Sequence, residues 1–501
     1  MPPTYSFQPF IDRVDRNWYE DDELLQRLLA RYAGSAAQDA RAALVDWGTL
    51  CAGTLRELAD ESARLENRPC LRHLDAYNHR VDEVVLPAST RRALEVVEGQ
   101  HHLGAVHGDP HVFTTMWYLY LQNGEAGVGC SLACTDGMVR ALEQLGDRPI
   151  HADVVRQVRQ SRPDRYTHGA QFVTEIQGGS DAGANLLEAR PDGARWTLHG
   201  QKWFCSNVNA DYFLVTARPT GAEPGARGVA LFLVPAYTDD GRRLRNGYTI
   251  DRLKDKVGTC ELATAEVTFA GAAAYPVGPL DRGLANTVSL VLVTSRFACI
   301  GVAAAFLRRA ERIAVAYADF REAFGRRLTE FPLIRDTLAE VRSGRERALA
   351  SLFALLRMWR AADRSGSETS TEALDFRYLL SLAKPVLTRD ATALAHEAIM
   401  VLGANGVEER FSPLPRLWRD AIVMETWEGP HNLLFTQALH DMTRYGVDPV
   451  AFVSRVAGEA RADLAQELSQ ILASAMEPEA TAAMARFAPK LIRAFGAAAL
   501  G

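Results

Sequence analysis

The spacing of hydrophobic and polar positions changes along the chain and divides it into three blocks. From about Asp21 to Ser161, Ala/Leu/Arg-rich stretches repeat with the period of a helix, and turn-forming triplets at 67–69 and 108–110 interrupt them. This pattern predicts an N-terminal helical domain over residues 1–165.

Short β-rich runs replace the helical period between about Gly169 and Pro279, with Gly/Pro-rich turn clusters between them. The clearest runs are Trp196–Leu198, Tyr212–Thr216, Val229–Val234 and Ala265–Phe269. Because no helical stretch separates consecutive runs, neighbouring strands are expected to pair antiparallel. The pattern predicts a central antiparallel β-domain over residues 166–280.

The helical period returns after Pro279 and persists to the end of the sequence. One expected helix carries its apolar residues on a single face, at Leu349, Leu352, Phe353, Leu356 and Trp359. A polar break at 364–372 separates it from the next helix. We expect a C-terminal helical bundle over 281–446 and a helical extension over 447–501. The predicted fold class is α+β: an N-terminal helical domain, a central antiparallel β-domain, and a C-terminal helical bundle with extra C-terminal helices.

The composition of the 501 residues is that of an ordinary globular protein, and the net charge of −6 gives no general attraction to polyanions. Seven cysteines are scattered without a CxxC pair; Cys130 and Cys134 lie four residues apart. Free thiols in a reducing compartment are therefore favoured over a disulfide or zinc site. Neither an uncharged apolar run of about 18 residues nor a secretory signal is evident, so we expect a cytoplasmic protein without a membrane span.

Two segments of the predicted β-domain could contact a ligand. From Val173 to Asp181 a strand leads into Gly-Gly-Ser-Asp, which lets the backbone approach an anionic or carbonyl-rich ligand while hydroxyls donate hydrogen bonds. In Gly200–Asn207 an aromatic residue precedes a hydroxyl by two positions, which suits the face and edge of a flat heteroaromatic ring. The alternative interpretations are a tight turn and a half-buried strand with packed aromatics.

Two segments of the C-terminal block could also carry chemistry. Arg321–Arg327 follows a predicted helix and could bind phosphate bidentately, or could be a solvated charged face. The second combines Leu402–Val407, Arg416–Asp420 and Trp427–Gly429. Its Glu428 lies between an aromatic residue and a glycine, and apolar surroundings would raise the pKa of this carboxyl toward that of a general base near neutrality. Taken alone, Glu428 could instead be a surface acid at a helix end.

The order of these segments in a helix–β–helix chain resembles the acyl-CoA dehydrogenase superfamily over roughly Asp15 to Tyr445. Thr174–Asp181 looks like the family's first motif, Leu402–Asp420 like its second, and Trp427–Gly429 like its catalytic aromatic-Glu-Gly. The chain is similar to the AidB-like branch, known from the bacterial response to DNA alkylation. The features shared with that branch are at Lys202–Ser206, Arg252–Lys256, Thr294–Phe297 and Trp427–Asn432, and more loosely at Asn17–Tyr19 and Arg80–Glu83.

The resemblance implies an FAD held between the β-domain and the C-terminal helices of a homotetramer. The cofactor-binding residues that it implies are Phe172, Val173, Thr174, Gly179, Ser180, Phe204, Cys205, Ser206, Arg321, Phe324, Gly403, Ala404, Asn405 and Asn432. Of these, Arg321, Phe324 and Gly403–Asn405 would reach the FAD of a neighbouring subunit. Substrate contacts are implied for Ser180, Arg296, Trp427 and Gly429. No metal is expected.

The implied reaction is the desaturation of an acyl thioester carried by CoA or by a carrier protein. Glu428 takes the α-proton while the β-hydride passes to the flavin, and hydrogen bonds to the thioester oxygen stabilise the enolate-like charge. The electrons leave to an electron-transfer flavoprotein or to oxygen. Met400, Pro430 and Phe331-Pro332 depart from the family pattern, which predicts weaker flavin binding and a substrate other than a simple fatty acyl-CoA.

Other functions compete with this one. A DNA-associated alkylation-protection flavoprotein needs a basic region after the core, but 447–501 carries five positive and six negative side chains, so nucleic-acid binding is not expected. A flavin oxidase or monooxygenase of secondary metabolism, which often lacks the base, and a non-catalytic flavoprotein are further alternatives. The histidines at His101, His102, His107 and His111 lack a completing Cys or acidic pair, so we expect a loop or helix end over the site entrance.

Overall fold

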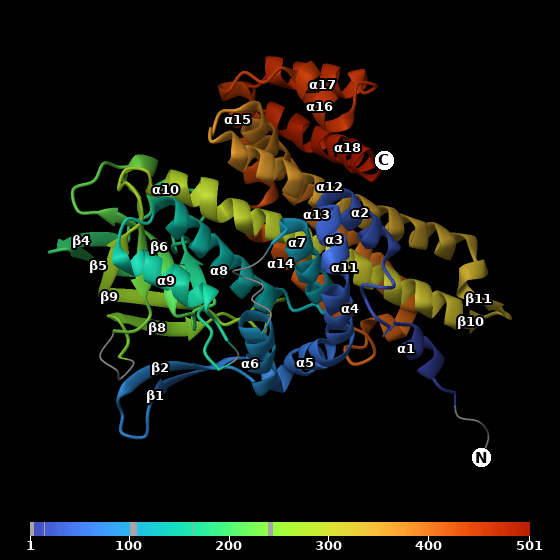
Figure 1. The fold of residues 1–501 in the computed structure, drawn as a ribbon, viewed down its shortest axis with the longest axis horizontal. Helices are drawn as coiled ribbons and strands as arrows, with labels where there is room; N and C mark the ends of the chain where they lie inside the picture. Colours follow the sequence, from blue (N-terminus) through green and yellow to red (C-terminus); the bar gives the residue numbers. More distant parts are fainter. Residues whose placement is uncertain (1–4, 15, 101–107, 163, 239–243) are drawn as a thin grey trace. The chain divides into compact units, whose positions relative to one another are not determined.

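The structure is a computed structural model that describes residues 5–14, 16–100, 108–162, 164–238 and 244–501. Its internal contacts divide the chain into two compact units, each built from segments that are not contiguous in sequence. Unit 1 comprises Met1–Glu57, His107–Gly124 and Arg296–Gly501, and unit 2 comprises Leu58–Val106 and Glu125–Ser295. Figure 1 shows the elements of both.

Unit 1 is mostly helical, with a short hairpin of strands β10 and β11. Its N-terminal elements are α1 (Gln8–Val14), α2 (Glu23–Ala33), α3 (Ser35–Asp39), α4 (Arg41–Leu50), η1 (Cys51–Leu55) and α7 (Pro110–Leu121). Its later elements are α11 (Leu292–Phe320), β10 (Glu322–Ala323), β11 (Arg326–Arg327), η7 (Leu328–Glu330), α12 (Pro332–Ser365), α13 (Thr371–Leu402), η8 (Gly403–Val407), α14 (Leu414–Thr426) and α15 (His431–Arg444). Helix α13 packs against α12, α14 and α15, so it lies at the centre of the predicted C-terminal bundle.

Helix α12 shows why the bundle forms where the sequence predicts it. The five apolar residues expected on one face, Leu349, Leu352, Phe353, Leu356 and Trp359, are all buried. The helix ends at Ser365, where Gly366 adopts a φ of 66°, a conformation that favours glycine. Ser370 then caps α13 by accepting a hydrogen bond from the Ala373 N–H at 3.1 Å. The polar break between the two helices is therefore confirmed.

The chain beyond Gly446 forms α16 (Pro449–Ala457), α17 (Ala462–Ala473) and α18 (Ala480–Leu500), as expected for a helical extension. Helix α18 packs against α12, α13 and α15, and Figure 1 shows the three terminal helices, in red, beside α15. A Cβ at Gly496 would lie 2.7 Å from Cγ of Arg347, so a glycine is needed for α18 to approach α12 this closely. The extension is thus part of unit 1 rather than a detached tail.

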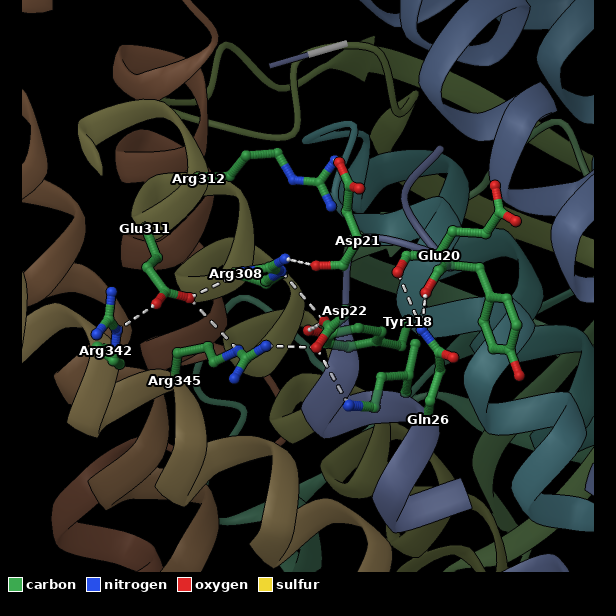
Figure 2. A network of polar contacts seen from close by, with 12 residues as sticks. Glu20, Asp21, Asp22, Gln26, Tyr118, Arg308, Glu311, Arg312, Arg342 and Arg345 are labelled. Carbon is green, nitrogen blue, oxygen red and sulfur yellow. Dashed lines mark hydrogen bonds and ion pairs between the residues drawn. The ribbon is translucent and has the colours of Figure 1, made fainter. Parts of the chain in front are cut away.

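A buried ion network joins α2 to α7, α11 and α12 (Figure 2). Asp22 caps α2 by accepting a hydrogen bond from the Leu25 N–H at 3.1 Å, and it accepts another from the Tyr118 hydroxyl at 2.9 Å. The same carboxylate pairs with Arg308 Nε at 3.1 Å and with Arg345. Burial by itself would raise the pKa of Asp22, but the two guanidinium groups outweigh it and hold that pKa below its ordinary value.

Unit 2 combines a few helices with strands. Its longer helical elements are α6 (Ala88–Leu94), η3 (Glu95–Gln100), α8 (Ala126–Leu145), α9 (Pro149–Arg159), α10 (Gly283–Asn286) and η6 (Thr287–Val291), while α5 (Arg56–Ser62) continues into it from unit 1. Its single-turn helices are η2 (Leu65–Asn67), η4 (Ala182–Ala184) and η5 (Ala226–Gly228). The N-terminal block is helical as predicted, but it also contains a hairpin of β1 (Cys70–Leu74) and β2 (Arg80–Val85) that the sequence pattern did not indicate. Its strands are mostly exposed, and apolar and polar residues do not alternate regularly along them, so no period-two pattern marks them in the sequence.

The main sheet of unit 2 lies in the predicted β-domain. Its strands are β3 (Gly169–Phe172), β4 (Glu188–Asp192), β5 (Arg195–Ser206), β6 (Tyr212–Pro219), β7 (Ala230–Pro235), β8 (Tyr248–Leu253) and β9 (Thr264–Pro276). The pairings β6-β4-β5-β9-β7 close on themselves because β7 also pairs with β6, and this ring surrounds buried rings such as those of Phe213, Phe232 and Phe269. The antiparallel prediction is confirmed for most pairings, but β3 and β4 run parallel to β6, since each is separated from it by more than a hairpin.

One helical stretch of the described residues, Gly283–Phe320, is long and apolar enough to cross a membrane by composition alone. In its most apolar window 83% of the residues are buried within the protein, as in the core helix of a globular protein. Length and hydropathy are therefore weak evidence for a membrane span here.

Candidate active site

The candidate base Glu428 lies in a turn between two helices of unit 1. Helix α14 ends at Thr426, and α15 begins after Pro430. Glu428 has a φ of 58° and Gly429 a φ of 104°, so both adopt left-handed backbone. For a residue with a side chain this conformation costs about 1–3 kcal/mol and persists only where surrounding contacts hold it. Such strain is common at functional sites, and here it falls on the residue that the sequence selected.

Two buried cations from other helices contact the backbone of this turn. Arg296 on α11 donates from Nε to the carbonyl oxygen of Glu428 at 3.0 Å. Lys384 on α13 donates from Nζ to the carbonyls of Glu425 at 2.9 Å and Gly429 at 3.0 Å. These bonds satisfy carbonyls that a helix end and a left-handed turn would otherwise leave without donors. The contact seen for Arg296, an expected substrate residue, is therefore with the turn.

The surroundings also set the charge of Glu428. Burial raises the pKa of its carboxyl, while the positive charges of Arg296 and Lys384 act in the opposite direction. Burial likewise lowers the pKa of Lys384. The direction of this shift, a raised pKa, is the one expected from the Trp-Glu-Gly context, and it makes the carboxylate a better proton acceptor than an ordinary glutamate.

Sequence reasoning missed three side chains around the turn. Lys384 is one of them, and no motif contained it. The others are His431 and Arg389, whose Nδ1 and Nη2 atoms lie 2.6 Å apart; His431 Nε2 also lies 3.4 Å from a carboxylate oxygen of Glu425. Burial, with Arg389 and Lys384, lowers the pKa of His431 to about 4, so it is neutral at pH 7. The available signal was a single lysine, followed by proline, inside an apolar run of α13.

Unit 2 brings together several of the expected cofactor-binding residues. The carbonyl of Thr174 accepts a hydrogen bond from the Trp203 N–H at 2.9 Å, so the first motif lies beside β5. A Cβ at Gly179 would lie 3.0 Å from Oγ1 of Thr174, which shows how closely the Gly-Gly-Ser-Asp turn folds back. Ser180 at the end of this turn is exposed. The turn therefore presents backbone and hydroxyl groups to solvent.

The alternation of side chains along β5 separates the expected residues into two faces. Phe204 is 50% exposed and Ser206 is half-buried, whereas Cys205 between them is fully buried. Phe172 on β3 is also fully buried, and Val173 after it is half-buried. Cys205 and Phe172 could therefore reach a ligand only through their backbone. The ammonium of Lys254 lies 4.7 Å from the centre of the Phe204 ring.

A buried ion pair holds the first motif in place. Lys202 Nζ lies 2.8 Å from Oε1 of Glu175, and both side chains are buried. Lys202 also donates to the Val173 carbonyl at 3.0 Å, and Glu175 accepts hydrogen bonds from the Leu186 N–H at 2.6 Å and the Leu187 N–H at 3.1 Å. The glutamate of the motif is thus a structural anchor rather than a ligand contact.

The remaining expected contacts lie in unit 1. Arg321 donates to the Tyr5 hydroxyl at 3.1 Å, and Phe324, with a φ of 52°, is 96% exposed at the tip of the β10–β11 hairpin. Asn405 donates to the Tyr317 hydroxyl at 2.9 Å. Gly403, Ala404 and Asn432 are exposed, and Trp427 is half-buried. The exposed aromatic ring and the hydroxyl groups in unit 2, and separately the arginine and the exposed glycine in unit 1, are of the chemical types that contact a flavin nucleotide.

The histidine segment does not form a metal site in the part of the chain that the structure describes. His101, His102 and His107 lie outside the described residues. His111 begins α7 and is buried between the rings of Tyr32 and Phe353, with centroids 5.4 and 5.7 Å away. Among the described residues, no group of three or more His, Cys, Asp or Glu side chains is arranged to hold a metal ion.

Three domain families match successive parts of the chain. The AidB N-terminal domain of the adaptive response protein matches residues 11–165, the acyl-CoA dehydrogenase middle domain matches 170–272, and the acyl-CoA dehydrogenase C-terminal domain matches 281–441. These spans reproduce the order helical, β-rich, helical that the sequence predicts.

Known proteins agree with these matches. Acyl-CoA dehydrogenase family member 11 of Caenorhabditis elegans is 31% identical over 84% of this chain and 70% of its own length. The putative acyl-CoA dehydrogenase AidB of Escherichia coli is 35% identical over 54% of this chain and 48% of its own length.

Solved structures share the fold. Bd2924 in its apo form superposes with a TM-score of 0.88 at 26% identity, covering 97% of this chain and 98% of that one. Caenorhabditis elegans ACDH-11 in complex with C11-CoA superposes with a TM-score of 0.86 at 26% identity, covering 97% of this chain and 87% of that one. The chain belongs to the acyl-CoA dehydrogenase family, in its AidB-like branch, and is a flavoenzyme acting on CH–CH donors.

Proposed function

We propose that this protein binds FAD and desaturates an acyl thioester between Cα and Cβ, with Glu428 as the base. The observation that carries the proposal is the turn that bears Glu428. The backbone of Glu428 is left-handed and is held by two buried cations, and its half-buried carboxyl has a raised pKa. A surface acid at a helix end would have neither the strain nor these contacts. The bound flavin supplies the acceptor for the hydride that leaves Cβ.

The turn can supply both groups that proton removal requires, a base and a hydrogen-bond donor to the thioester oxygen. An α-C–H is a very weak acid, so the carboxylate of Glu428 needs help from donors that stabilise charge on the thioester oxygen. The backbone N–H at Glu428 is such a donor. Its direction is fixed by the same φ of 58° that directs the side chain. The proton stays on Glu428, and the electron pair of the α-C–H bond forms the new double bond as the β-hydride departs.

A thioester of CoA is the first substrate class to test. The structure of Caenorhabditis elegans ACDH-11 was solved in complex with C11-CoA, and this chain covers 87% of that protein. We also propose the expected cofactor contacts of Thr174, Ser180, Phe204, Ser206 and the other residues named above, and the substrate contacts of Ser180, Arg296, Trp427 and Gly429. An electron-transfer flavoprotein or oxygen would be the acceptor for a cytoplasmic homotetramer.

Nucleic-acid binding is not favoured by the C-terminal extension. Three of its five cations form ion pairs: Arg455 with Asp375, Arg461 with Asp463, and Lys490 with Glu467. A cation already paired with a carboxylate gains little from a phosphate, because the existing pair must first break. These ion pairs argue against a DNA-binding role for the C-terminal extension.

The proposal is tested by anaerobic bleaching of the protein-bound flavin with acyl-CoA thioesters of increasing length. The wild-type protein should bleach with at least one of them, and Glu428→Gln should abolish bleaching while leaving the flavin bound. Glu459→Gln, at an exposed position between α16 and α17, is the matched control and should bleach as the wild type does. Equal bleaching by wild type and Glu428→Gln would show that Glu428 is not the base.

A further inference from the structure

Lys384 is a lysine in an unusual place. It lies in α13, is 0% exposed, and is surrounded along the helix by buried residues. Its ammonium donates to two main-chain carbonyls, those of Glu425 at 2.9 Å and Gly429 at 3.0 Å. Among the residues that the structure describes, it forms no ion pair with a carboxylate. Among the described residues, the hydrogen-bond acceptors of this buried ammonium are therefore main-chain carbonyls before and after Glu428.

Burying an ammonium without a carboxylate partner is costly, and a methionine or leucine would fill similar space without that cost. The hydrogen bonds that Lys384 donates must offset the penalty. The Glu425 carbonyl belongs to the last turn of α14, where intrahelical donors run out, and a cation there also opposes the negative end of the helix dipole. The Gly429 carbonyl lies beyond the strained residue. One side chain thus joins the two ends of the turn.

The contacts of Lys384 complement that of Arg296. Arg296 from α11 holds the Glu428 carbonyl, and Lys384 from α13 holds the carbonyls that flank it. The φ of 58° at Glu428 is unfavourable for a residue with a Cβ and needs such support. Without Lys384 the flanking peptides would be free to rotate, and the turn could relax toward ordinary backbone with its carboxylate pointing elsewhere.

We propose that Lys384 is a positioning residue for Glu428: by holding the carbonyls of Glu425 and Gly429 it fixes the left-handed turn and the direction in which the carboxylate points. We call the two hydrogen bonds from Lys384 to the carbonyls of Glu425 and Gly429 the clasp. Its role in catalysis rests on the proposed function, whereas its presence in the turn does not depend on that function. In the part of the chain that the structure describes, the hydrogen bonds of Lys384 go to backbone carbonyls, so it acts through Glu428 rather than on the substrate.

Several titratable groups face this turn and bear on its pH dependence. Arg296 and Cys299 approach from α11, Glu425 from α14 and His431 from α15, and Arg389 shares α13 with Lys384. Removing the charge of Lys384 leaves Arg296 as the cation that acts on Glu428. The Glu428 carboxylate would then be harder to form, and activity that requires it would begin at a higher pH.

The test compares Lys384→Met, which removes charge and donors, with Lys384→Gln, which retains one donor group without charge. Lys490→Met is the matched control, because Lys490 is an exposed lysine paired with Glu467 on the surface. Amide hydrogen exchange of the peptide covering 425–432 is measured by mass spectrometry. We expect faster exchange there in Lys384→Met, a smaller increase in Lys384→Gln, and no change in α2 or in Lys490→Met.

The effect of the Lys384 variants on catalysis is measured with flavin-loaded protein. Misplacing a catalytic group by about 1 Å can cost on the order of 10²-fold in rate, so kcat should fall by about that factor in Lys384→Met, with a much smaller change in KM. The acid limb of its pH–rate profile should move to higher pH. A residue that only fills space would lower stability without moving this limb.

The outcomes separate the two proposals. Unchanged exchange at 425–432 in both variants would overturn the clasp, and unchanged kcat with an unchanged acid limb would overturn the positioning role. If the wild-type protein bleaches with no thioester, the proposed function fails, and the exchange measurement alone decides whether Lys384 holds the turn. If Lys384→Met does not fold, Lys384→Gln provides the same comparison.

Discussion

Replacing Asp22 tests how the N-terminal segment is held within unit 1. Its carboxylate is completely buried, pairs with Arg308 and Arg345, accepts a hydrogen bond from Tyr118, and caps α2 (Figure 2). Asp22→Asn keeps a side-chain oxygen for the cap but removes the charge. Two buried guanidinium groups then lose their shared partner.

The loss of stability expected for Asp22→Asn follows from these contacts. Breaking a buried ion pair by removing one partner costs about 3–5 kcal/mol. Glu311 stays beside both arginines, with 3.1 Å to Arg308 and 3.5 Å to Arg345, so we expect the lower end, about 3 kcal/mol. At about 1.4 kcal/mol per factor of ten, the opening equilibrium of α2 should rise on the order of 10²-fold. Asp22→Ala also loses the cap and should cost about 1 kcal/mol more.

Native-state hydrogen exchange of the α2 amides measures this opening directly. It is preferable to a single unfolding midpoint, because a chain of this size need not unfold in one step. Asp463→Asn, at an exposed pair in the C-terminal extension, is the control and should leave α2 unchanged. If α2 exchanged as slowly in Asp22→Asn as in the wild type, the network would contribute no stability and the reasoning would be wrong.

The pKa of Asp22 adds a pH dependence with a definite sign. The pKa of Asp22 in the folded protein lies below that of an ordinary aspartate, because the two arginines outweigh the effect of burial. The stabilisation is therefore present above the unfolded pKa of about 4 and is lost as pH falls through the folded pKa. Protection of α2 in the wild type should decline in acid, and Asp22→Asn should remove that part of the decline.

Three further outcomes are expected. Burial raises the pKa of Glu98 to about 8 and that of Asp136 to about 7. The neutral forms of both carboxyls therefore stabilise unit 2. This contribution is complete below the pKa values of the unfolded chain, and it is lost as pH rises through the pKa values of the folded protein. Glu98→Gln with Asp136→Asn should flatten this decline in urea unfolding between about pH 5 and pH 8. Lys202→Met leaves the buried Glu175 without its partner and should destabilise unit 2 by about 3–5 kcal/mol, seen in the same urea unfolding, and should release flavin more readily on dilution. The acid limb of wild-type thioester activity should lie above the pKa of an ordinary glutamate, since burial raises that of Glu428; a limb at or below that value would contradict this assignment.

Periodicity and motif order determined much of the protein from the sequence. The buried face of α12, the break before α13, the β-rich insert and the terminal helices all follow from local spacing of apolar and polar residues, which each segment carries in itself. The identity of Glu428 as a candidate base also came from sequence, because four ordered motifs are far more specific than one. The β1–β2 hairpin was missed because its strands are mostly exposed and their apolar and polar residues show no regular alternation.

Only the tertiary structure decided what surrounds Glu428. Its left-handed backbone depends on Arg296 and Lys384, which lie 132 and 44 positions away in sequence and meet it through packing of α11, α13 and the end of α14. The same holds for Asp22, whose partners come from three other helices. The sequence does not reveal the partner of a buried charge, because that partner depends on how the helices pack. The sequence therefore identified the carboxylate of Glu428, and the tertiary structure determined which residues hold it.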